Sequence, residues 1–187
     1  MTSEVARRFG TGRGLVRLLL SYPEVALGQA AIAKPDPLSI RRLVFVCHGN
    51  ICRSAFADVL ARNLGLNATS FGLSTRSGLA AHPPAQSLAL SLGVDLSLHR
   101  TTRVEDYAPH AGDLLLAMET RQLRRIGARA ELAALPRTLL GLYARPVVPH
   151  LHDPFELDDA YMAVCLQRIK TAVVTLAAAF PGARSGG

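Results

Sequence analysis

The feature that most constrains the fold of this chain is a short apolar run that leads into an unusual loop. Residues 43–46 are Leu, Val, Phe and Val, and residues 47–54 run Cys-His-Gly-Asn-Ile-Cys-Arg-Ser. An uninterrupted run of β-branched and aromatic residues predicts a strand buried on both faces. A helical pattern begins at Ser54 and stops near Gly65. A strand, a loop and a helix in this order predict one unit of an α/β fold.

The alternation of strands and helices continues along the rest of the chain. The patterns are, in order, a strand at 68–73, a helix at 83–92, a strand at 113–118, a helix from about 119, a strand at 138–143 and a helix capped by Asp158 that runs to about 179. We therefore predict a three-layer α/β fold. It has a four-stranded parallel sheet, helices on both faces, and the loop 47–54 after the first strand.

Residues 1–40 differ from the chain that follows them. Three glycines lie close together at positions 10, 12 and 14, and an amphipathic stretch covers about 15–33 with a break expected at Pro23. Pro35 and Pro37 then form a stiff connector. We predict an N-terminal extension of unknown role at 1–40 and one domain at 41–183.

Composition limits the class of protein. The chain has 187 residues, of which 49% are hydrophobic, enough for one domain with a buried core. We find no apolar run of the roughly 18 residues that span a membrane, and predict no membrane contact. Three cysteines do not make a disulfide framework, so we predict a reduced, cytoplasmic setting.

The net charge of +7 raises the question of an acidic partner. The arginines are scattered, and no basic run is interleaved with aromatic residues, so we predict no nucleic-acid partner. The densest group recurs at helical spacing: Arg121, Arg124, Arg125 and Arg129. A solvated helix face is the favoured interpretation, and a docking face for an acidic partner is the alternative.

The loop 47–54 has the residue types of a phosphate-binding site. A loop between a strand and a helix directs backbone N–H groups and the positive helix end at one point, which suits an anion. Cys47 would lie on the floor of this nest, where a helix N-terminus and Arg53 favour the thiolate. The Arg53 fork matches two phosphate oxygens. The alternative is a buried core thiol, but burial does not explain the residues around Cys47.

The other loop residues have conformational or hydrogen-bonding roles in this interpretation. Gly49 permits a close backbone approach or a positive φ, and Asn50 tolerates the left-handed conformation. Ser54 caps the helix or donates to the sulfur. We predict that the following residues line the phosphate site: His48, Gly49, Asn50, Ile51, Cys52, Arg53 and Ser54.

Residues 44–54 resemble the active-site signature of the low-molecular-weight protein tyrosine phosphatases. The resemblance continues at His99-Arg100, at residues 113–118 and at Asp153-Pro154-Phe155, and it covers about residues 41–180. It implies hydrolysis of phosphotyrosine on proteins through a phosphocysteine on Cys47, with no metal or organic cofactor.

The same resemblance assigns further residues. Asp153 is implied as the general acid, on a loop that Pro154 stiffens, and His99 as a buried histidine that braces the phosphate loop. It implies that Cys52 forms a reversible disulfide with Cys47. A loop-packing role for Cys52 stays open as the alternative.

A second interpretation of the segment around Asp153 is a metal site. His150, His152 and Asp153 lie within four positions, and these residue types bind zinc. No convincing further ligand occurs elsewhere in the sequence, so we favour a solvated or hydrogen-bonded loop.

Substrate choice depends on the pocket rim, where the chain departs from the family pattern. Phe155 stands where relatives often have Tyr, residues 74–78 contain no aromatic, Ala55 replaces a usual proline, and His48 follows the nucleophile. Three alternatives to a tyrosine phosphatase are open. A phosphoarginine phosphatase has Thr in place of Ile51, and an arsenate reductase needs a further cysteine pair. A binding module without catalysis would lack Cys47, Arg53 or Asp153.

The resemblance also suggests partners. Bacterial relatives often reverse tyrosine kinases of polysaccharide export, so a phosphotyrosine-containing protein such as a bacterial tyrosine kinase is the expected partner. No residue in the sequence identifies it, and the sequence predicts no oligomeric state.

Overall fold

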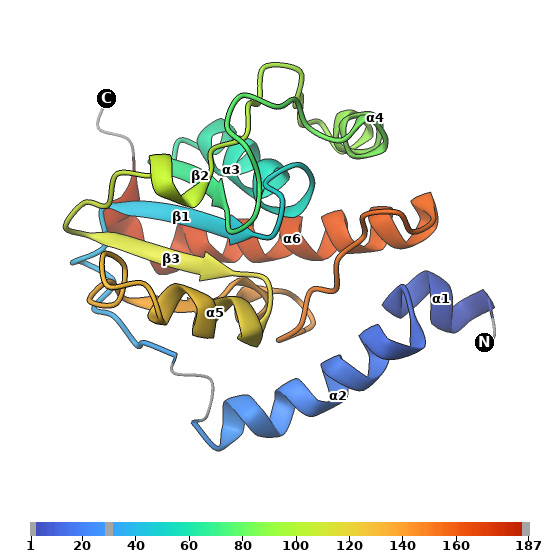
Figure 1. Ribbon diagram of the computed structural model, residues 1–187, viewed down its shortest axis with the longest axis horizontal. Helices are drawn as coiled ribbons and strands as arrows, with labels where there is room; N and C mark the ends of the chain where they lie inside the picture. The colour runs from blue at the N-terminus through green and yellow to red at the C-terminus, as the bar shows by residue number, and fades with distance from the viewer. Residues whose placement is uncertain (1–2, 29–31, 185–187) are drawn as a thin grey trace.

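The computed structural model describes residues 3–28 and 32–184, which form an α/β fold (Figure 1). The strands are β1 (Arg42–Cys47), β2 (Ala68–Gly72), β3 (Asp113–Ala117) and β4 (Arg137–Leu139). The α-helices are α1 (Ser3–Phe9), α2 (Gly12–Ala26), α3 (Arg53–Asn63), α4 (Pro83–Ser91), α5 (Thr120–Gly127) and α6 (Asp159–Ala179). Short 3-10 helices are η1 (Val104–Asp106), η2 (Leu140–Tyr143) and η3 (Pro181–Ala183).

The four strands form one parallel sheet in the order β2-β1-β3-β4. The predicted four-stranded parallel sheet is therefore confirmed. β1 is central, and its residue Phe45 pairs with Ser70 of β2 and Leu116 of β3. Because all strands run the same way, their carboxyl ends share one edge, where open α/β sheets bind ligands. Cys47 ends β1 at this edge, and Glu119 follows β3 at the same edge.

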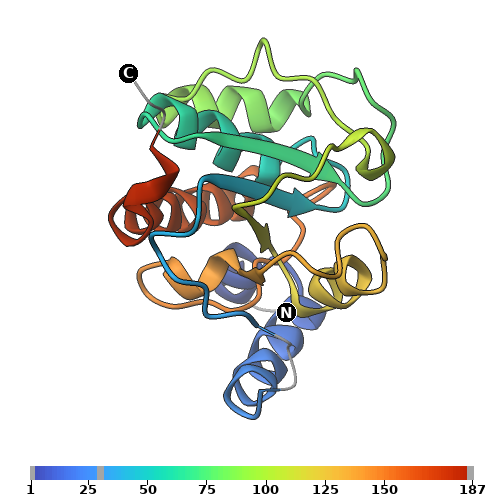
Figure 2. The same cartoon turned by 90° about the vertical axis from the view of Figure 1, so that its left-hand side faces the viewer.

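Alternate residues of the central strands face two hydrophobic cores, one on each side of the sheet. Leu43 and Phe45 pack into the larger core with side chains of α3, α4 and α6. Val44 and Val46 pack into the smaller core with Leu123 of α5. The strands are buried on both faces, which explains why the sequence shows apolar runs without alternation. Figure 2 shows the sheet between these helical layers.

The fourth strand is shorter than the sequence predicts. We expected a strand at 138–143, but β4 ends at Leu139 and residues 140–143 form η2. The carbonyl of Gly141 accepts a hydrogen bond of 2.9 Å from the backbone N–H of Val148, so the chain folds back here. A side chain at position 141 would collide with the Val148 carbonyl. This close approach favours the tight turn over an extended strand.

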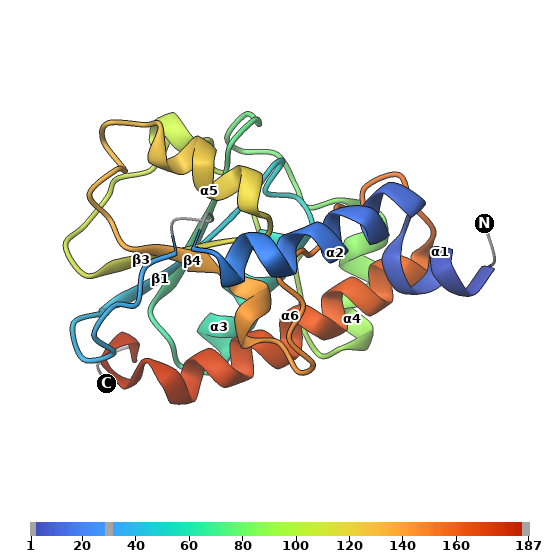
Figure 3. The same ribbon diagram turned by 90° about the horizontal axis from the view of Figure 1, so that it is seen from below.

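The described part of the N-terminal extension forms α1 and α2, and the break expected at Pro23 is absent from α2. Pro23 lies inside α2 rather than breaking it. It stands in the last turn, where its missing N–H removes only one helical hydrogen bond. The predicted amphipathic stretch continued to 33, and its residues 29–31 lie outside the described part of the chain. Figure 3 shows α1 beside the first turns of α6.

One helix has the length and apolar character of a membrane span, contrary to our expectation from the sequence. This helix is α6, with 21 residues. It packs against α3 and η2, and several of its side chains lie in the larger core: Tyr161, Met162, Cys165, Leu166, Ile169, Ala172, Val173 and Leu176. Its apolar residues therefore form part of the core of the domain. Asp158 caps the helix, as predicted, by accepting from the N–H of Tyr161 at 2.7 Å.

Candidate active site

Asn50 organises the loop between β1 and α3. Its φ of 56° is the left-handed conformation that asparagine tolerates. Its side-chain amide donates to the hydroxyls of Ser54 and Ser70, both at 2.9 Å, and its side-chain oxygen accepts from the N–H of Thr102 at 2.8 Å. Nε2 of His99 lies 2.8 Å from the carbonyl oxygen of Asn50. The loop is thus tied to three other segments and is preorganised.

The sulfur of Cys47 is the focus of these contacts. It accepts from the backbone N–H of Asn50 at 3.2 Å and lies 2.9 Å from the hydroxyl of Ser54. Since the Asn50 amide already donates to that hydroxyl oxygen, the Ser54 proton can point to the sulfur. Two hydrogen-bond donors and the N-terminus of α3 thus meet at this sulfur, an arrangement suited to a nucleophile in an anion-binding loop.

His99 stands next to the loop as a neutral hydrogen-bond donor. Burial lowers the pKa of His99, although the carbonyl of Asn50 acts in the opposite direction. A carbonyl oxygen is only an acceptor, so Nε2 carries the proton that it donates to Asn50. This contact holds the loop in its left-handed turn.

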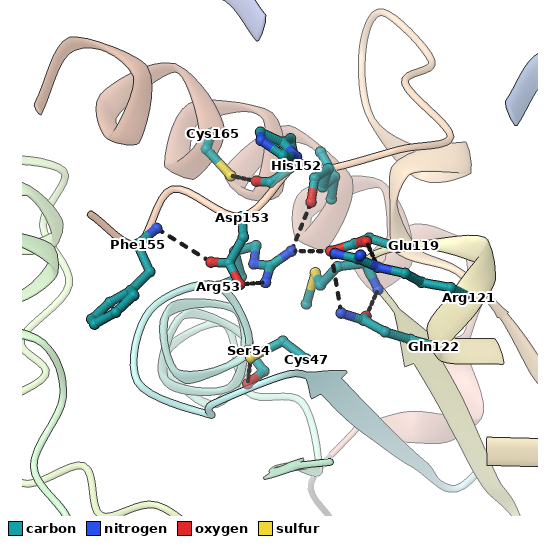
Figure 4. A network of polar contacts seen from close by, with 12 residues as sticks. Cys47, Arg53, Ser54, Glu119, Arg121, Gln122, His152, Asp153, Phe155 and Cys165 are labelled. Atoms are coloured by element: carbon teal, nitrogen blue, oxygen red, sulfur yellow. Dashed lines mark hydrogen bonds and ion pairs between the residues drawn. The ribbon is translucent and has the colours of Figure 1, made fainter. Parts of the chain in front are cut away.

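Arg53 is bound by two carboxylates at the mouth of the loop. Its side chain is 1% exposed. Nη1 lies 2.9 Å from Oε1 of Glu119 and 2.8 Å from the carbonyl oxygen of Leu151, and Nη2 lies 2.5 Å from Oδ2 of Asp153 (Figure 4). Arg53 thus links the start of α5, the loop after η2 and the start of α3. Its Nε is buried with no hydrogen-bond partner in residues 3–28 and 32–184, so this N–H is available to an anion.

Asp153 and Cys47 line the same cavity. The cavity measures about 220 Å³, and Figure 4 shows the Asp153 carboxylate beside the Arg53 guanidinium. The lining residues are Cys47, His48, Gly49, Ile51, Cys52, Arg53, Ser74, Thr75, Leu79, Asp153 and Phe155. The Asp153 side chain is 32% exposed, so it is accessible from the cavity mouth. The structure therefore brings together the predicted nucleophile, the predicted arginine and the predicted acid.

Phe155 supplies one apolar wall of this cavity. It is 41% exposed, and its ring meets the ring of His82 edge-on, with 5.0 Å between the centroids. Ile51 and Leu79 are further apolar lining residues. The entrance therefore suits a flat, apolar group attached to a phosphate.

Comparison with known proteins places this site in a family. Residues 42–183 match the model of the low molecular weight phosphotyrosine protein phosphatases. The chain belongs to this family. The structure resembles Wzb of Escherichia coli K30 in complex with sulphate, with a TM-score of 0.63, 27% identity, and coverage of 72% of this chain and 94% of that one. It resembles the YwlE arginine phosphatase of Geobacillus stearothermophilus equally, with a TM-score of 0.63, 26% identity, and coverage of 74% and 91%.

Curated relatives in sequence carry the same family name. A probable low molecular weight protein-tyrosine-phosphatase, EpsP of Ralstonia solanacearum, is 37% identical over 92 residues, which are 48% of this chain and 63% of that protein. The Ptp phosphatase of Acinetobacter johnsonii is 28% identical over 138 residues, 73% of this chain and 95% of that protein. The match to EpsP thus spans less than two thirds of that relative.

Glu119 is the site residue that the sequence analysis missed. It is fully buried, and both of its oxygens face arginines: Oε1 contacts Arg53 and Oε2 contacts Arg121. Burial alone would raise the pKa of Glu119, but the two guanidinium groups outweigh it and lower this pKa to about 2. One signal could have found it. An acidic residue directly after β3 lies at the sheet edge where β1 ends, beside the phosphate loop.

Removal of the Glu119 charge is expected to destabilise the fold. In Glu119→Gln the buried Arg53 loses one counter-charge, and breaking a buried ion pair costs about 3–5 kcal/mol. The pKa of Glu119 lies below its ordinary value of 4.5 in the folded state. Its stabilisation is therefore present above about pH 4.5 and is lost as the pH falls toward 2. In urea unfolding, the difference in free energy of unfolding between wild type and Glu119→Gln should become smaller as the pH falls from 7 to 3. A difference that does not change with pH would contradict this account.

The two histidines before Asp153 are packed into the protein. Burial lowers the pKa of His150 to about 4 and also lowers the pKa of His152, so both rings are neutral at pH 7. The rings stack with 5.7 Å between centroids. Nε2 of His152 lies 3.1 Å from the hydroxyl of Thr11. Within the described ranges 3–28 and 32–184, no group of three or more metal-ligating side chains is placed to hold a metal ion.

All three cysteines are free thiols. Burial raises the pKa of Cys52, and the nearby Cys47 raises it further. Burial likewise raises the pKa of Cys165 to about 12, and the Cys165 thiol lies 3.8 Å from the carbonyl oxygen of His152. Cys47, with two donors directed at its sulfur, is therefore the cysteine best suited to be the nucleophile. A disulfide between Cys47 and Cys52 stays a prediction.

The arginine group of α5 contacts other parts of the protein more than the sequence predicts. Arg124 pairs with Glu24 of α2, and Arg129 pairs with Glu105 at 2.7 Å. Arg125 donates to the carbonyl oxygen of Leu73 at 3.0 Å. Arg121, Arg124 and Arg125 are exposed, as a solvated helix face predicts, and the pairs with Glu24 and Glu105 are additional contacts. Arg121 and Arg125 also line a second cavity of about 260 Å³, together with His48, Gln122 and Asp153.

Proposed function

We propose that this protein hydrolyses phosphotyrosine in proteins through a phosphocysteine intermediate on Cys47. One observation carries the proposal. The Cys47 sulfur, with its two hydrogen-bond donors, and the Asp153 carboxyl line the same cavity. Membership of the phosphotyrosine phosphatase family supports it.

In the first step the Cys47 thiolate attacks phosphorus, and an S–P bond forms as the P–O bond to the phenol breaks. Asp153 donates its proton to the leaving oxygen, a contribution typically worth about 10²–10⁴-fold. In the second step the Asp153 carboxylate accepts a proton from water, which attacks phosphorus and breaks the S–P bond. Phosphate leaves and the thiolate returns. Backbone N–H groups of residues 48–53 and the N-terminus of α3 stabilise the phosphoryl oxygens.

Arg53 contacts Asp153 in the free enzyme and would contact the phosphoryl group when substrate binds. Its Nη2 contacts Asp153 and its Nη1 contacts Glu119. A bound phosphoryl group competes with Asp153 for this guanidinium, which releases the carboxyl to meet the leaving oxygen. Glu119 keeps the guanidinium oriented during the exchange, because it holds the opposite nitrogen.

The substrate can be tested directly. One preparation is compared on a phosphotyrosine peptide, on the matching phosphoarginine peptide, and on arsenate with thioredoxin. We expect hydrolysis of the phosphotyrosine peptide. The similarity to an arginine phosphatase makes phosphoarginine the second candidate substrate. Ile51 argues against it, because a phosphoarginine phosphatase is expected to have Thr at this position. Preference for phosphoarginine, or arsenate reduction, would overturn the tyrosine assignment.

The second cavity suggests which phosphotyrosines are preferred. It shares His48 and Asp153 with the catalytic cavity, so the two adjoin. Arg121 and Arg125 give it positive charge, which suits an acidic side chain next to the phosphotyrosine. We propose acidic sequences, including those of bacterial tyrosine kinases in the cytoplasm, as the substrate class.

Replacement of Arg125 by glutamine tests this preference. We expect kcat/KM for a phosphotyrosine peptide with flanking glutamates to fall roughly 2- to 5-fold, the range of a partly exposed ion pair. The value for a neutral peptide should change little. Arg124→Gln is the matched control, because Arg124 is on the same helix but pairs with Glu24 and does not line the cavity. Equal effects of the two variants on both peptides would exclude the preference.

A further inference from the structure

The N-terminal extension contacts the loop that carries Asp153. Residues 1–41 lie outside the family match at 42–183. Even so, the hydroxyl of Thr11 lies 3.1 Å from Nε2 of His152, the residue directly before Asp153. The two residues are 141 positions apart in the sequence. A segment outside the family domain thus touches the neighbour of the proposed acid.

Thr11 is well placed to hold His152 in a fixed position. Its hydroxyl oxygen caps α2 by accepting from the N–H of Gly14 at 2.9 Å, so the Thr11 rotamer is set by the helix it starts. The second lone pair and the proton of that hydroxyl remain for the imidazole ring. Because burial keeps the His152 ring neutral, one hydrogen bond to Nε2 satisfies that nitrogen in either tautomer.

Two glycines allow the extension to approach this closely. A β-carbon at position 14 would lie 2.8 Å from the ring of His152. At position 10, where φ is +75°, a β-carbon would lie 2.8 Å from Leu157 and 2.9 Å from Tyr161. At position 14 the β-carbon would also lie against the Phe9 carbonyl, so neither position has room for a larger residue without movement of the chain. Gly10 and Gly14, two of the three glycines noted in the sequence, therefore lie at the contact with the acid loop and the start of α6.

The acid loop is an irregular segment that several elements hold in place, and Arg53 contacts both the Asp153 carboxylate and the Leu151 carbonyl. Residues 144–158 contain no helix or strand, apart from the turn at 155–157. The carbonyl oxygen of His152 accepts from the hydroxyl of Tyr161 at 3.3 Å, and the backbone N–H of Leu151 donates to the carbonyl of Met118 at 3.0 Å. Figure 4 shows the Cys165 thiol of α6 beside the backbone carbonyl of His152. The ring of His152 thus contacts Thr11 of the extension, and its backbone carbonyl contacts Tyr161 of α6.

The far end of the extension is anchored separately. Glu24 of α2 pairs with Arg124 of α5, and the hydroxyl of Tyr22 donates to the carbonyl of Val147 at 2.9 Å. Leu18 is buried in the larger core. These anchors keep α2 against the domain, so the position of Thr11 is defined relative to the sheet.

We propose that Thr11 is a positioning residue for the general acid, acting through His152, and this inference rests on the proposed function. The extension limits the motion of the loop and keeps the Asp153 carboxyl over the site of the leaving oxygen. Misplacement of a reacting group by about 1 Å can cost on the order of 10²-fold in rate. A contact that restrains this loop therefore has a kinetic effect, although Thr11 never touches substrate.

The test uses the full chain and two aryl phosphates. Phenyl phosphate needs a proton on its leaving oxygen, whereas 2,4-dinitrophenyl phosphate has a leaving group that departs without one. In Thr11→Val we expect kcat/KM for phenyl phosphate to fall roughly 3- to 10-fold, the value of one hydrogen bond. The value for dinitrophenyl phosphate should stay within about 2-fold of wild type. Thr11→Ser keeps the hydroxyl and should restore wild-type values on both substrates.

A second pair of variants separates the contact with His152 from the cap of α2. His152→Phe keeps a ring but removes Nε2, and it leaves the cap intact. We expect the same selective loss as in Thr11→Val, and no further loss in the double variant, because both changes remove one hydrogen bond. Arg7→Gln is the control within the extension, since it removes an exposed ion pair with Glu4 inside α1 that touches neither α2 nor the acid loop. This variant should not change the ratio of the kcat/KM values for the two aryl phosphates.

Other results would overturn the inference. Equal losses on both aryl phosphates would show a general effect on folding or binding. Additive losses in the double variant would show that Thr11 and His152 act independently. A wild-type protein that hydrolyses neither aryl phosphate would instead contradict the proposed function, so the two failures are distinguishable.

Discussion

Replacement of Cys47 by serine is expected to abolish turnover of aryl phosphates and phosphotyrosine peptides. A serine hydroxyl at this position is not ionised at neutral pH and is a far weaker nucleophile than a thiolate. Hydrogen-bond donation from the Asn50 N–H and the Ser54 hydroxyl does not make an alkoxide available. The loop conformation depends on Asn50 rather than on the sulfur, so the phosphate nest should persist.

Two measurements check this result. Steady-state hydrolysis of p-nitrophenyl phosphate should fall to the uncatalysed background, while calorimetry should still detect binding of phosphate or vanadate. Cys165→Ser is the matched control, because that buried thiol lies in α6 and has no part in the proposed chemistry. Turnover of Cys47→Ser near the wild-type rate would exclude Cys47 as the nucleophile.

Replacement of Asp153 by asparagine is expected to lower kcat by on the order of 10²–10⁴-fold for substrates with a phenol-like leaving group. The amide is nearly the same size as the carboxyl but cannot donate a proton as an acid or accept one from water. Binding should not weaken, because the variant removes the carboxylate that competes with phosphate for Nη2 of Arg53. We therefore expect KM to stay equal or to fall.

The measurement is a series of aryl phosphates with leaving groups of increasing basicity. Without the acid, kcat/KM should fall more steeply as the leaving group becomes more basic. Asp159→Asn is the control: Asp159 is an exposed carboxylate in the first turn of α6, six positions along the chain. If Asp153→Asn kept the wild-type dependence on leaving group, the acid would have to lie elsewhere.

Much of the fold was predictable from local patterns. The apolar run at 43–46 became the central strand β1, and the helix predicted from Ser54 became α3. The helix at 83–92 matches α4, and Asp158 caps α6 as predicted. These predictions succeeded because each depends on residues that are neighbours in the sequence. The fourth strand was wrong beyond Leu139, because the turn at Gly141 depends on Val148, seven residues away.

The apolar helix α6 shows the same limit. Its composition alone does not separate a membrane span from a core helix. The side chains of α3 and of the sheet that pack on α6 identify it as a core helix of this domain. These contacts cannot be read from the sequence of α6.

The loop at 47–54 could be recognised before the structure was known, because its residues are contiguous with the strand and the helix that shape it. The residues that surround the loop became visible only in the folded chain. Glu119 holds Arg53 across 66 positions, and Thr11 meets His152 across 141. The physical reason is that hydrogen bonds and ion pairs between distant segments depend on how helices and strands pack, and such contacts leave no periodic pattern in either segment.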